Sequence, residues 1–269
     1  METLVKNETV PRVSLAVCLI IYNVTVDKSE SLIAIRNQID SNQIYVFDNS
    51  SNEDISFENR NTSKVMGINY IKTDNLGLGK TYNDAVKVVK KQYDFIVFFD
   101  QDTEIPNNFI SVLSSKLNSE SQIIVPEVNA DEKKISPISR KKRLYNFDKI
   151  PEFSAINSGM CVSKKVFETI RFDEDLFLDY VDHDFFNKVS LNKITIETIP
   201  VVLLQNFSDN EYNITKASKR FETYLNDSKI YSKIYGSSVY LSVFRHALKL
   251  SLRYRSLLFF KRMISNEEH

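Results

Sequence analysis

The feature that most constrains the fold is an apolar run that ends in two carboxylates. Phe95–Phe99 is continuously apolar, and Asp100 and Asp102 follow at once. An apolar run without alternation is typical of a strand buried on both faces of a parallel sheet. In such α/β proteins ligands bind outside the carboxyl ends of the strands, where two carboxylates can share a divalent cation that also holds a diphosphate. The alternative is that Asp102 or Thr103 caps a helix that begins near Pro106.

Length and composition indicate one large domain with an appendage. The chain has 269 residues, 42% of them hydrophobic, with 35 basic and 35 acidic residues. The resulting net charge of zero provides no overall field for nucleic acid, so we expect no nucleic-acid partner. Cys18 and Cys161 lie in apolar stretches, as buried thiols of a reduced compartment do. Because no signal pattern and no apolar run of ~18 residues occurs, we expect a cytoplasmic protein.

Strand and helix patterns alternate in the first part of the chain. Val13–Ile21, Gln43–Phe47 and Gly67–Lys72 read as strands, and about 28–38 carries apolar residues at helical spacing. This order predicts a mostly parallel central sheet with right-handed crossovers, and a ligand site along its carboxyl edge.

Polar and aromatic side chains follow the first two of these strands. Tyr22 and Asn23 come after the first strand, and Asp48 ends the second. An aromatic ring beside a carboxylate is a suitable arrangement for a nucleobase and its ribose. Asp48 equally well forms an Asx-turn, since its neighbours are short and polar.

A turn with two glycines precedes the next helix. The segment runs from Asn75 through Gly79 and Lys80 to Asn83. The helix that follows the glycines is expected to continue to about Lys91. The spacing of a phosphate-binding Walker loop is absent, which argues against a nucleoside triphosphatase. We instead expect this helix N-terminus to approach the same ligand, with Lys80 or Asn83 facing it.

Two later segments are further candidates for a ligand site. The polar stretch 127–150, with a basic tetrad at 140–143, is either an active-site flap or a disordered loop. The tetrad is either a solvated face or an attraction for an anionic ligand. Asn157, Ser158 and Gly159 then interrupt a strand-like segment with small residues that permit a backbone to approach a ligand.

The most acidic part of the chain lies between residues 173 and 185, where six carboxylates alternate with large apolar side chains. Asp182 and Asp184 open a helix, so the helix dipole accounts for part of this charge. The remainder, including Asp179, is costly to gather unless it faces a cation or a polar substrate.

The last part of the chain changes character. We expect one helix over about 212–235 and a second over 239–264, and the second has no acidic residue from Arg245 to Arg262. A basic amphipathic helix of this kind is typical of elements that lie on anionic membranes. It is equally consistent with packing on the catalytic domain or on a second subunit, which would make a homodimer.

Taken together, these blocks resemble the family 2 inverting glycosyltransferases of the GT-A fold, in particular bacterial rhamnosyltransferase-like enzymes of cell-surface polysaccharide synthesis. The blocks are Tyr22-Asn23, Asp48-Asn49-Ser50, Asn75 to Asn83, Asp100-Gln101-Asp102, Asn157-Ser158-Gly159 and Phe172 to Asp182. The resemblance implies a Rossmann-like α/β catalytic domain over 1–210, with helices flanking a mostly parallel sheet, and a helical extension over 211–269.

The resemblance also implies roles for individual residues. Asp182 falls at the position of the general base, and Asp100 with Asp102 would hold Mg²⁺ or Mn²⁺ on the diphosphate of the donor. The acceptor or sugar side would comprise Asn157, Ser158, Gly159 and Asp179. The donor side would comprise Tyr22, Asn23, Asp48, Asn75, Gly79, Lys80, Asn83, Asp100 and Gln101.

One position departs from the family pattern. These enzymes usually carry a histidine after the last strand, in a pattern like Leu-x-His-x-x-Gly, and this chain has Gln205 there. Gln205 would bind the metal as a neutral oxygen donor or not at all.

The expected activity is metal-dependent, inverting transfer of a sugar such as rhamnose from a dTDP- or UDP-linked donor. The acceptor would be a glycan or a lipid-linked molecule of capsule, cell-wall or exopolysaccharide synthesis, reached at the inner face of the cell membrane. A second hypothesis is a catalytically weakened nucleotide-binding or scaffold protein, with Gln205 as its sign. A sugar nucleotidyltransferase is disfavoured, because Val17–Val26 lacks the glycine-rich basic loop that a triphosphate requires.

Overall fold

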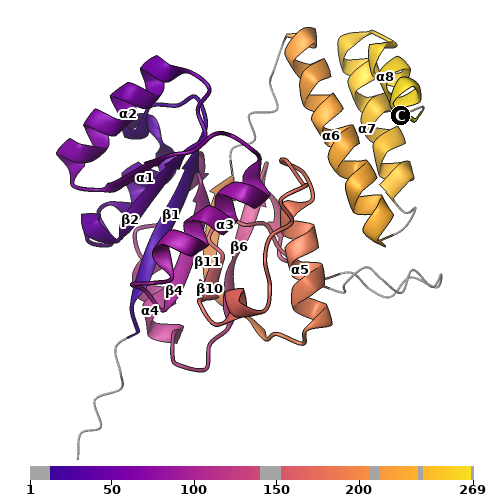
Figure 1. The fold of residues 1–269 in the computed structure, drawn as a ribbon. Coiled ribbons are helices and arrows are strands. Elements are labelled where there is room, and N and C mark those ends of the chain that lie inside the picture. The colour runs from indigo at the N-terminus through magenta and orange to yellow at the C-terminus, as the bar shows by residue number, and fades with distance from the viewer. Residues whose placement is uncertain (1–12, 140–152, 206–212, 236–238, 268–269) are drawn as a thin grey trace, which may run out of the picture.

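The computed structural model describes residues 13–139, 153–205, 213–235 and 239–267, which surround one mixed sheet (Figure 1). Its strands are β1 (Leu15–Ile21), β2 (Ile44–Asp48), β3 (Asn69–Lys72), β4 (Phe95–Asp100), β5 (Thr103–Glu104), β6 (Ile123–Ala130), β7 (Lys133–Ser136), β10 (Cys161–Ser163) and β11 (Ile196–Gln205). They lie in the order β3-β2-β1-β4-β10-β6-β11-β5, with β7 paired to β6. A separate short hairpin joins β8 (Ile138–Ser139) to β9 (Phe153–Ser154).

Most strands of the sheet point the same way. β1 pairs in parallel with β2 and β4, β2 with β3, and β6 with β11. β10 is antiparallel to both β4 and β6, so those two also share a direction. The prediction of a mostly parallel sheet is therefore confirmed. The carboxyl ends of β1, β2, β4 and β11 consequently meet at one edge.

Helices cover both faces of the sheet (Figure 1). They are α1 (Glu30–Ile35), α2 (Glu53–Met66), α3 (Leu78–Val89), α4 (Phe109–Lys116), α5 (Val181–Leu191), α6 (Ile214–Tyr235), α7 (Val239–Tyr254) and α8 (Leu258–Glu267). Side chains of β4 alternate between the two layers, as the period of a strand requires. Phe99 packs with the core under α1 and α4, whereas Phe98 packs with the core under α3 and α5.

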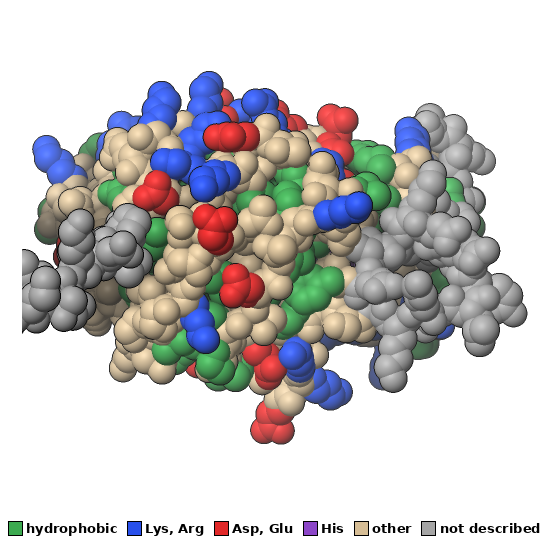
Figure 2. All heavy atoms as spheres, turned by 90° about the horizontal axis from the view of Figure 1, so that it is seen from below, with side chains coloured by type: hydrophobic (Ala, Val, Ile, Leu, Met, Phe, Trp, Pro, Cys, Tyr) green, Lys and Arg blue, Asp and Glu red, His purple; other side chains and the backbone are tan. Residues whose placement is uncertain are grey.

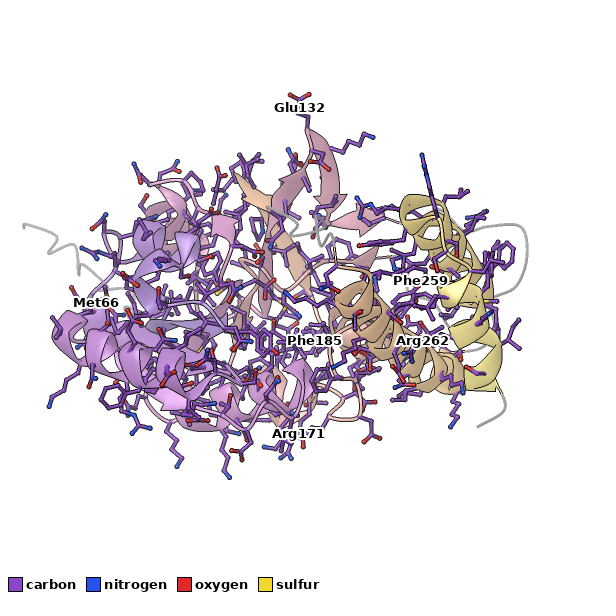
Figure 3. All side chains as sticks on the ribbon, turned by 90° about the horizontal axis from the view of Figure 1, so that it is seen from above. Met66, Glu132, Arg171, Phe185, Phe259 and Arg262 are labelled. Atoms are coloured by element: carbon purple, nitrogen blue, oxygen red, sulfur yellow. The ribbon has the colours of Figure 1, made fainter. Side chains whose placement is uncertain are left out.

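The C-terminal helices share one of these two cores. Phe221 of α6 and Phe259 of α8 belong to the same cluster of buried side chains as Phe185 of α5. Seen from above, Phe185 lies between the sheet and the C-terminal helices, and Phe259 lies within the helical bundle (Figure 3). The extension is therefore packed on the catalytic domain, which is one of the arrangements that the sequence left open. The predicted division at 210/211 lies outside the described residues.

Two elements differ from the sequence prediction near the site. Helix α2 is absent from the prediction, although Asn52 caps it through Asp54 N and Ile55 N, and Gly67 ends it in the left-handed conformation. The helix expected at Pro106 begins at Phe109, and its N-cap is Asn108. The alternative in which Asp102 or Thr103 caps this helix is therefore wrong.

Two longer segments also differ. Strand β6 runs to Ala130 and the chain returns as β7, so part of the polar stretch 127–150 is sheet, while the tetrad at 140–143 lies outside the described residues. The helix predicted over 239–264 breaks into α7 and α8. Arg255 is left-handed with φ 48°. Ser256 N bonds to Ser251 O, and Ser256 Oγ accepts from Leu258 N, so the break closes one helix and starts the next.

On the surface shown in Figure 2, acidic and basic side chains are interspersed. Among the helices that the described residues form, none has the length and apolarity needed to cross a bilayer.

Helix α3 depends on two glycines where it meets the acidic segment. Gly77, with φ 105°, is its N-cap, and Leu78 N donates to Phe177 O over 2.6 Å. A Cβ on Gly79 would lie 1.9 Å from the carbonyl oxygen of Asp173. The two glycines therefore leave room for the backbone of the segment 173–177. The sequence analysis had expected a ligand at this helix N-terminus.

We predict that Gly79→Ala destabilises the protein by ~2–4 kcal/mol, because one of two backbones must move. Urea denaturation measures this loss. The matched control is Gly67→Ala, where φ is 70° and the nearest atom to a Cβ is Ser41 Cβ at 3.9 Å. Backbone strain alone should cost about 1 kcal/mol there. Equal losses in the two variants would contradict the packing role of Gly79.

Candidate active site

Two carboxylates lie where β4 ends. Asp100 is the last residue of β4, and Asp102 lies in the turn that leads to β5. The hydroxyl of Ser158 is 3.3 Å from Asp100 Oδ2, and the hydroxyl of Tyr82 is 3.4 Å from Oδ1. Ser158 and Tyr82 are buried, with exposures of 0% and 1%. Asp100 is thus oriented from inside the protein.

Asp102 is held by Gln205 at the end of β11. Gln205 Nε2 donates to Asp102 Oδ1 over 2.6 Å, and Gln205 Oε1 accepts from the hydroxyl of Thr103 over 2.9 Å. The Thr103 and Ser158 hydroxyls are 2.7 Å apart. One hydrogen-bond network therefore links both carboxylates. The Gln205 oxygen thus accepts from Thr103, while its amide nitrogen orients Asp102.

The electrostatics of the site are strained by like charges. Burial, and then the negative charges of Asp102 and Asp182, raise the pKa of the Asp100 carboxyl to about 6, although Ser158 and Tyr82 lower it. Burial also raises the pKa of Asp102, opposed by the hydrogen bond from Gln205. A cation placed between these carboxylates would relieve both the repulsion and the desolvation cost.

The two carboxylates suit a cation site that substrate completes. Within the described ranges, no group of three or more His, Cys, Asp or Glu side chains is arranged to hold a metal ion. Mg²⁺, however, is commonly held by one or two carboxylates together with water and substrate phosphates. The residues present therefore fit Mg²⁺ or Mn²⁺, provided that the phosphate groups of a ligand supply further oxygens.

Asp182 approaches this site from α5. After burial, its charge is one of the causes that raise the pKa of both Asp100 and Tyr82, so Asp182 lies near the end of β4. Asp182 Oδ1 accepts from the backbone N of His183 over 2.7 Å. The N-cap of α5, Tyr180, has φ 65°. Left-handed backbone is uncommon for tyrosine, and such strain often occurs at functional sites.

The segment before α5 is fixed by a residue that the sequence analysis missed. Asp227 of α6 is 1% exposed, and its carboxylate accepts from the backbone N–H groups of Phe177, Leu178 and Asp179 at 2.7–2.9 Å. Asp179 itself pairs with Arg220 of α6 through two contacts of 2.5 and 2.8 Å. Its side chain therefore links the acidic segment to the C-terminal helices. No short-range pattern identifies Asp227 before α6 is placed.

The small-residue block has two different roles. Ser158 belongs to the carboxylate network, whereas Gly159, with φ 78°, is required by packing, since its Cβ would meet Leu203 and Pro126 at 2.6 Å. Asn157 is buried, and its Oδ1 has no hydrogen-bond partner within the described structure. An unsatisfied acceptor of this kind is suited to a ligand hydroxyl.

The ends of β1 and β2 form the other side of the site. Tyr22 is 48% exposed, and its backbone N donates to Gln101 Oε1 over 2.8 Å. Asn23 has φ 51°, and its Oδ1 accepts from Ser51 N and Asn52 N. These contacts bind the two strand ends together and leave the ring of Tyr22 accessible to a flat ligand.

Asp48 lies deeper than the sequence analysis expected. It is fully buried, and it accepts from Ser50 N, Asn59 Nδ2 and the hydroxyl of Tyr70 at 2.8–3.0 Å. The bond to Ser50 N is the Asx-turn of the alternative interpretation. A nucleobase would reach this carboxylate only after its present partners were displaced.

The polar residues of the α3 turn also have partners in the protein. Lys80 pairs with Asp84 over 2.5 Å. Asn83 donates to Phe172 O and Glu174 Oε1 and accepts from Phe172 N. Asn75 is left-handed, with φ 49°. Lys80 and Asn83 therefore hold helix α3 and the acidic segment in this conformation, whereas the prediction had one of them facing a ligand.

Comparison with known proteins gives a consistent result. Residues 16–176 match the model of a family described as Glycosyl transferase family 2. The dTDP-rhamnosyl transferase RfbF of Shigella flexneri is 35% identical over 139 residues, which cover 47% of this chain and 47% of that protein. The chain thus matches about half the length of this curated relative.

Solved structures resemble the fold at low identity. The structure of S. aureus TarS 1-349 aligns with a TM-score of 0.52 and 17% identity, over 80% of this chain and 64% of that one. Glucosyl-3-phosphoglycerate synthase from Mycobacterium tuberculosis aligns with a TM-score of 0.53 and 10% identity, over 84% of this chain and 80% of that one. These likenesses confirm the predicted GT-A type of α/β fold.

The raised pKa of Asp100 predicts a pH-dependent stability. Because the pKa is about 6 in the folded protein and 3.8 for an ordinary aspartate, the metal-free protein loses stability as pH rises from about 4 to 6. We expect Asp100→Asn to be more stable than wild type by roughly 1–3 kcal/mol at pH 7 in EDTA, and much less so at pH 4. Urea titrations across this range measure the difference. Asp175→Asn, an exposed carboxylate of the acidic segment, is the control and should change little. A constant difference at all pH values would contradict the assignment.

Proposed function

The chain belongs to glycosyl transferase family 2, and from this premise we propose that it transfers a sugar from a nucleoside diphosphate donor to an acceptor hydroxyl with inversion. The observation that carries the proposal is the position of Asp100 at the end of β4, where burial and then the charges of Asp102 and Asp182 raise its pKa. One site thus holds two carboxylates suited to a cation and a third suited to remove a proton.

The donor side is assigned to the strand ends of β1 and β4. The exposed ring of Tyr22 would stack on the nucleobase, and Gln101 fixes the backbone of Tyr22. Asp100 and Asp102 would hold Mg²⁺ or Mn²⁺ on the diphosphate. When bound, the cation supplies positive charge that stabilises the leaving nucleoside diphosphate. Ser158 and Gln205 keep the two carboxylates oriented before donor binds.

The acceptor side is assigned to α5. Asp182 would take the proton of the attacking hydroxyl while that oxygen displaces the diphosphate from the opposite face of the sugar. A single displacement inverts the anomeric centre and requires no covalent enzyme intermediate. Asn157 Oδ1, buried and without a partner in the described residues, would accept from a sugar hydroxyl. Asp227 keeps the segment before α5, and hence Asp182, in place.

The identity of the donor rests on the relatives. The Shigella flexneri relative is named a dTDP-rhamnosyl transferase, which supports a dTDP-linked sugar such as rhamnose. The M. tuberculosis structure is described as a complex with Mn²⁺ and UDP, which supports a nucleoside diphosphate with a divalent metal. We propose a glycan or lipid-linked acceptor of cell-surface polysaccharide synthesis, used at the inner face of the cell membrane.

Replacing the base separates transfer from donor binding. We expect Asp182→Asn to reduce the rate of transfer by ~10²–10⁴-fold, because the amide cannot take the proton. The affinity for donor should remain within about twofold, since Asp182 does not hold the nucleotide. Radiolabelled sugar transfer and calorimetric binding measure the two quantities. Asp175→Asn in the same segment is the control, and wild-type transfer by Asp182→Asn would show that the base is another residue.

A thermal-shift panel tests donor and metal together. We expect one of the dTDP-, UDP- or GDP-linked sugars to raise Tm in Mn²⁺ but not in EDTA, since a ligand at about 100 times Kd stabilises by ~2.7 kcal/mol. Asp102→Asn should lose this metal-dependent increase, while Asp175→Asn, an exposed carboxylate of the acidic segment, should keep it. Binding without transfer to any acceptor would favour the catalytically weakened protein instead.

A further inference from the structure

Helix α7 carries an exposed apolar stripe. Its members Leu241, Phe244, Leu248 and Leu252 are 56%, 47%, 40% and 71% exposed. Spacings of three and four residues put them on one side of the helix. The opposite side, which includes Ala247 with no exposed surface, is buried against the bundle. The four residues form what we call the α7 stripe. Large exposed apolar patches commonly mark interaction sites.

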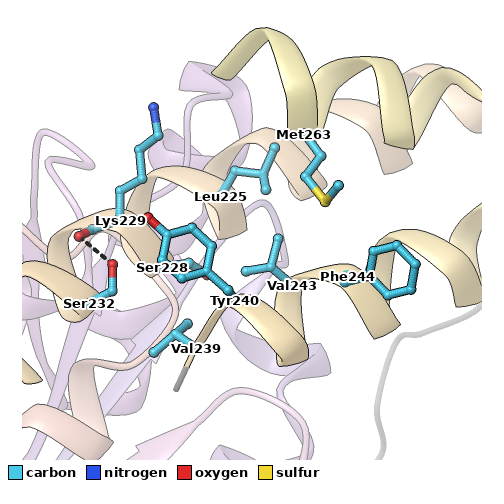
Figure 4. A pocket seen from close by; sticks show the side chains of 9 residues that line it. All are labelled: Leu225, Ser228, Lys229, Ser232, Val239, Tyr240, Val243, Phe244 and Met263. Atoms are coloured by element: carbon cyan, nitrogen blue, oxygen red, sulfur yellow. Dashed lines mark hydrogen bonds between the residues drawn. The ribbon is translucent and has the colours of Figure 1, made fainter. Parts of the chain in front are cut away.

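An apolar cavity adjoins this stripe. It has a volume of about 230 Å³ and lies between α6, α7 and α8 (Figure 4). Leu225, Val239, Val243 and Met263 contribute apolar walls. Phe244 belongs to both the cavity wall and the stripe, so the two apolar surfaces are continuous. Ser228, Lys229 and Ser232 of α6 contribute polar side chains to this lining.

The charged residues of the segment that carries the stripe all have one sign. From Val239 to Ser265 the chain has no Asp or Glu, and its basic residues are Arg245, Lys249, Arg253, Arg255, Lys261 and Arg262. Arg245 and Lys249 are exposed and each directly follows a member of the stripe, so they lie along its border. Arg262 is used within the bundle, where it pairs with Glu222 over 2.8 Å.

This combination selects among possible partners. In a symmetric dimer the same patch faces itself, so the cations bordering the stripe would meet cations of the second copy without carboxylates from this segment to neutralise them. An anionic lipid bilayer offers both apolar chains for the stripe and negative head groups for its border. We propose that the α7 stripe docks on the surface of an anionic phospholipid bilayer, with the cavity receiving part of an acyl chain. This proposal does not depend on the sugar transfer proposed above.

Flotation with vesicles tests the docking without donor or acceptor. We expect the full chain to bind vesicles of equal parts phosphatidylglycerol and phosphatidylcholine, and to remain unbound with phosphatidylcholine alone. Arg245→Glu/Lys249→Glu should weaken binding by ~10-fold or more, as each basic side chain near an anionic surface contributes several-fold. The matched control is Lys87→Glu/Lys91→Glu, another exposed pair four residues apart, at the end of α3.

The apolar part is tested in the same assay. We expect Leu241→Gln/Leu248→Gln/Leu252→Gln to weaken binding to anionic vesicles by at least ~10-fold, because the interface no longer receives their apolar surface. Phe57→Gln/Val65→Gln is the control, since both residues are exposed on α2. Met66, at the end of α2, and Arg262 of α8 lie at opposite sides of the molecule (Figure 3).

A fluorescence probe gives the orientation even if a variant binds poorly. The chain has no tryptophan, so Leu248→Trp and Phe57→Trp each introduce a unique indole. On anionic vesicles with brominated acyl chains, the first should shift to the blue and be quenched, and the second should remain unchanged.

Three results would overturn the proposal. The first is no flotation of the wild type, and the second is equal quenching of the two indoles. The third is a wild-type dimer, seen by mass photometry, that the triple leucine variant dissociates, because the stripe would then be buried between copies. Loss of vesicle binding with unchanged donor-induced Tm shifts would support docking whatever the outcome of the transfer assays.

Discussion

The carboxylate of Asp227 is a buried contact between the C-terminal helices and the segment that leads to Asp182. Three consecutive backbone N–H groups donate to it, at the point where the acidic segment turns into α5. Burial raises the pKa of Asp227 in spite of these bonds, so desolvation of the carboxylate is only partly offset. Any other conformation of the segment would leave this buried carboxylate without its three N–H donors, which is costly. The position of Asp182 thus depends on a helix that begins after the sheet is complete.

At the edge of the sheet, by contrast, the ends of the strands bring like charges close together. The carboxyl ends of β4 and β11 converge, and a network of Ser158, Thr103 and Gln205 orients Asp100 and Asp102 without neutralising them. Hydrogen bonds from neutral groups keep the carboxylates in place while leaving the negative charge for a cation. A neutral glutamine at this position is consistent with that arrangement, since it adds no further charge.

Sequence patterns were most informative where one strand carried its own signal. The buried run before Asp100, the strands ending at Tyr22 and Asp48, and the helix start at Asp182 are all found in the structure within a few residues. Helix α2 was overlooked although Asn52 and Gly67 delimit it. The contact of the α3 glycines with the segment 173–177 was not predicted, since local sequence cannot tell a close ligand from a close backbone. The long C-terminal helix was predicted without its break, because Arg255 carries no breaker signal.

The sequence by itself determined the class of fold, the family and the strand end at which carboxylates gather, because burial period and short motifs are local properties. Only the tertiary structure decided what each polar group near that strand end contacts. Gln205 and Asp102 are separated by 103 positions, and Asp227 and Phe177 by 50. Pairings over such distances depend on packing of the whole domain. The opening pair of carboxylates therefore keeps its predicted place, while Asn83 and Gln205 take roles that their local sequence could not reveal.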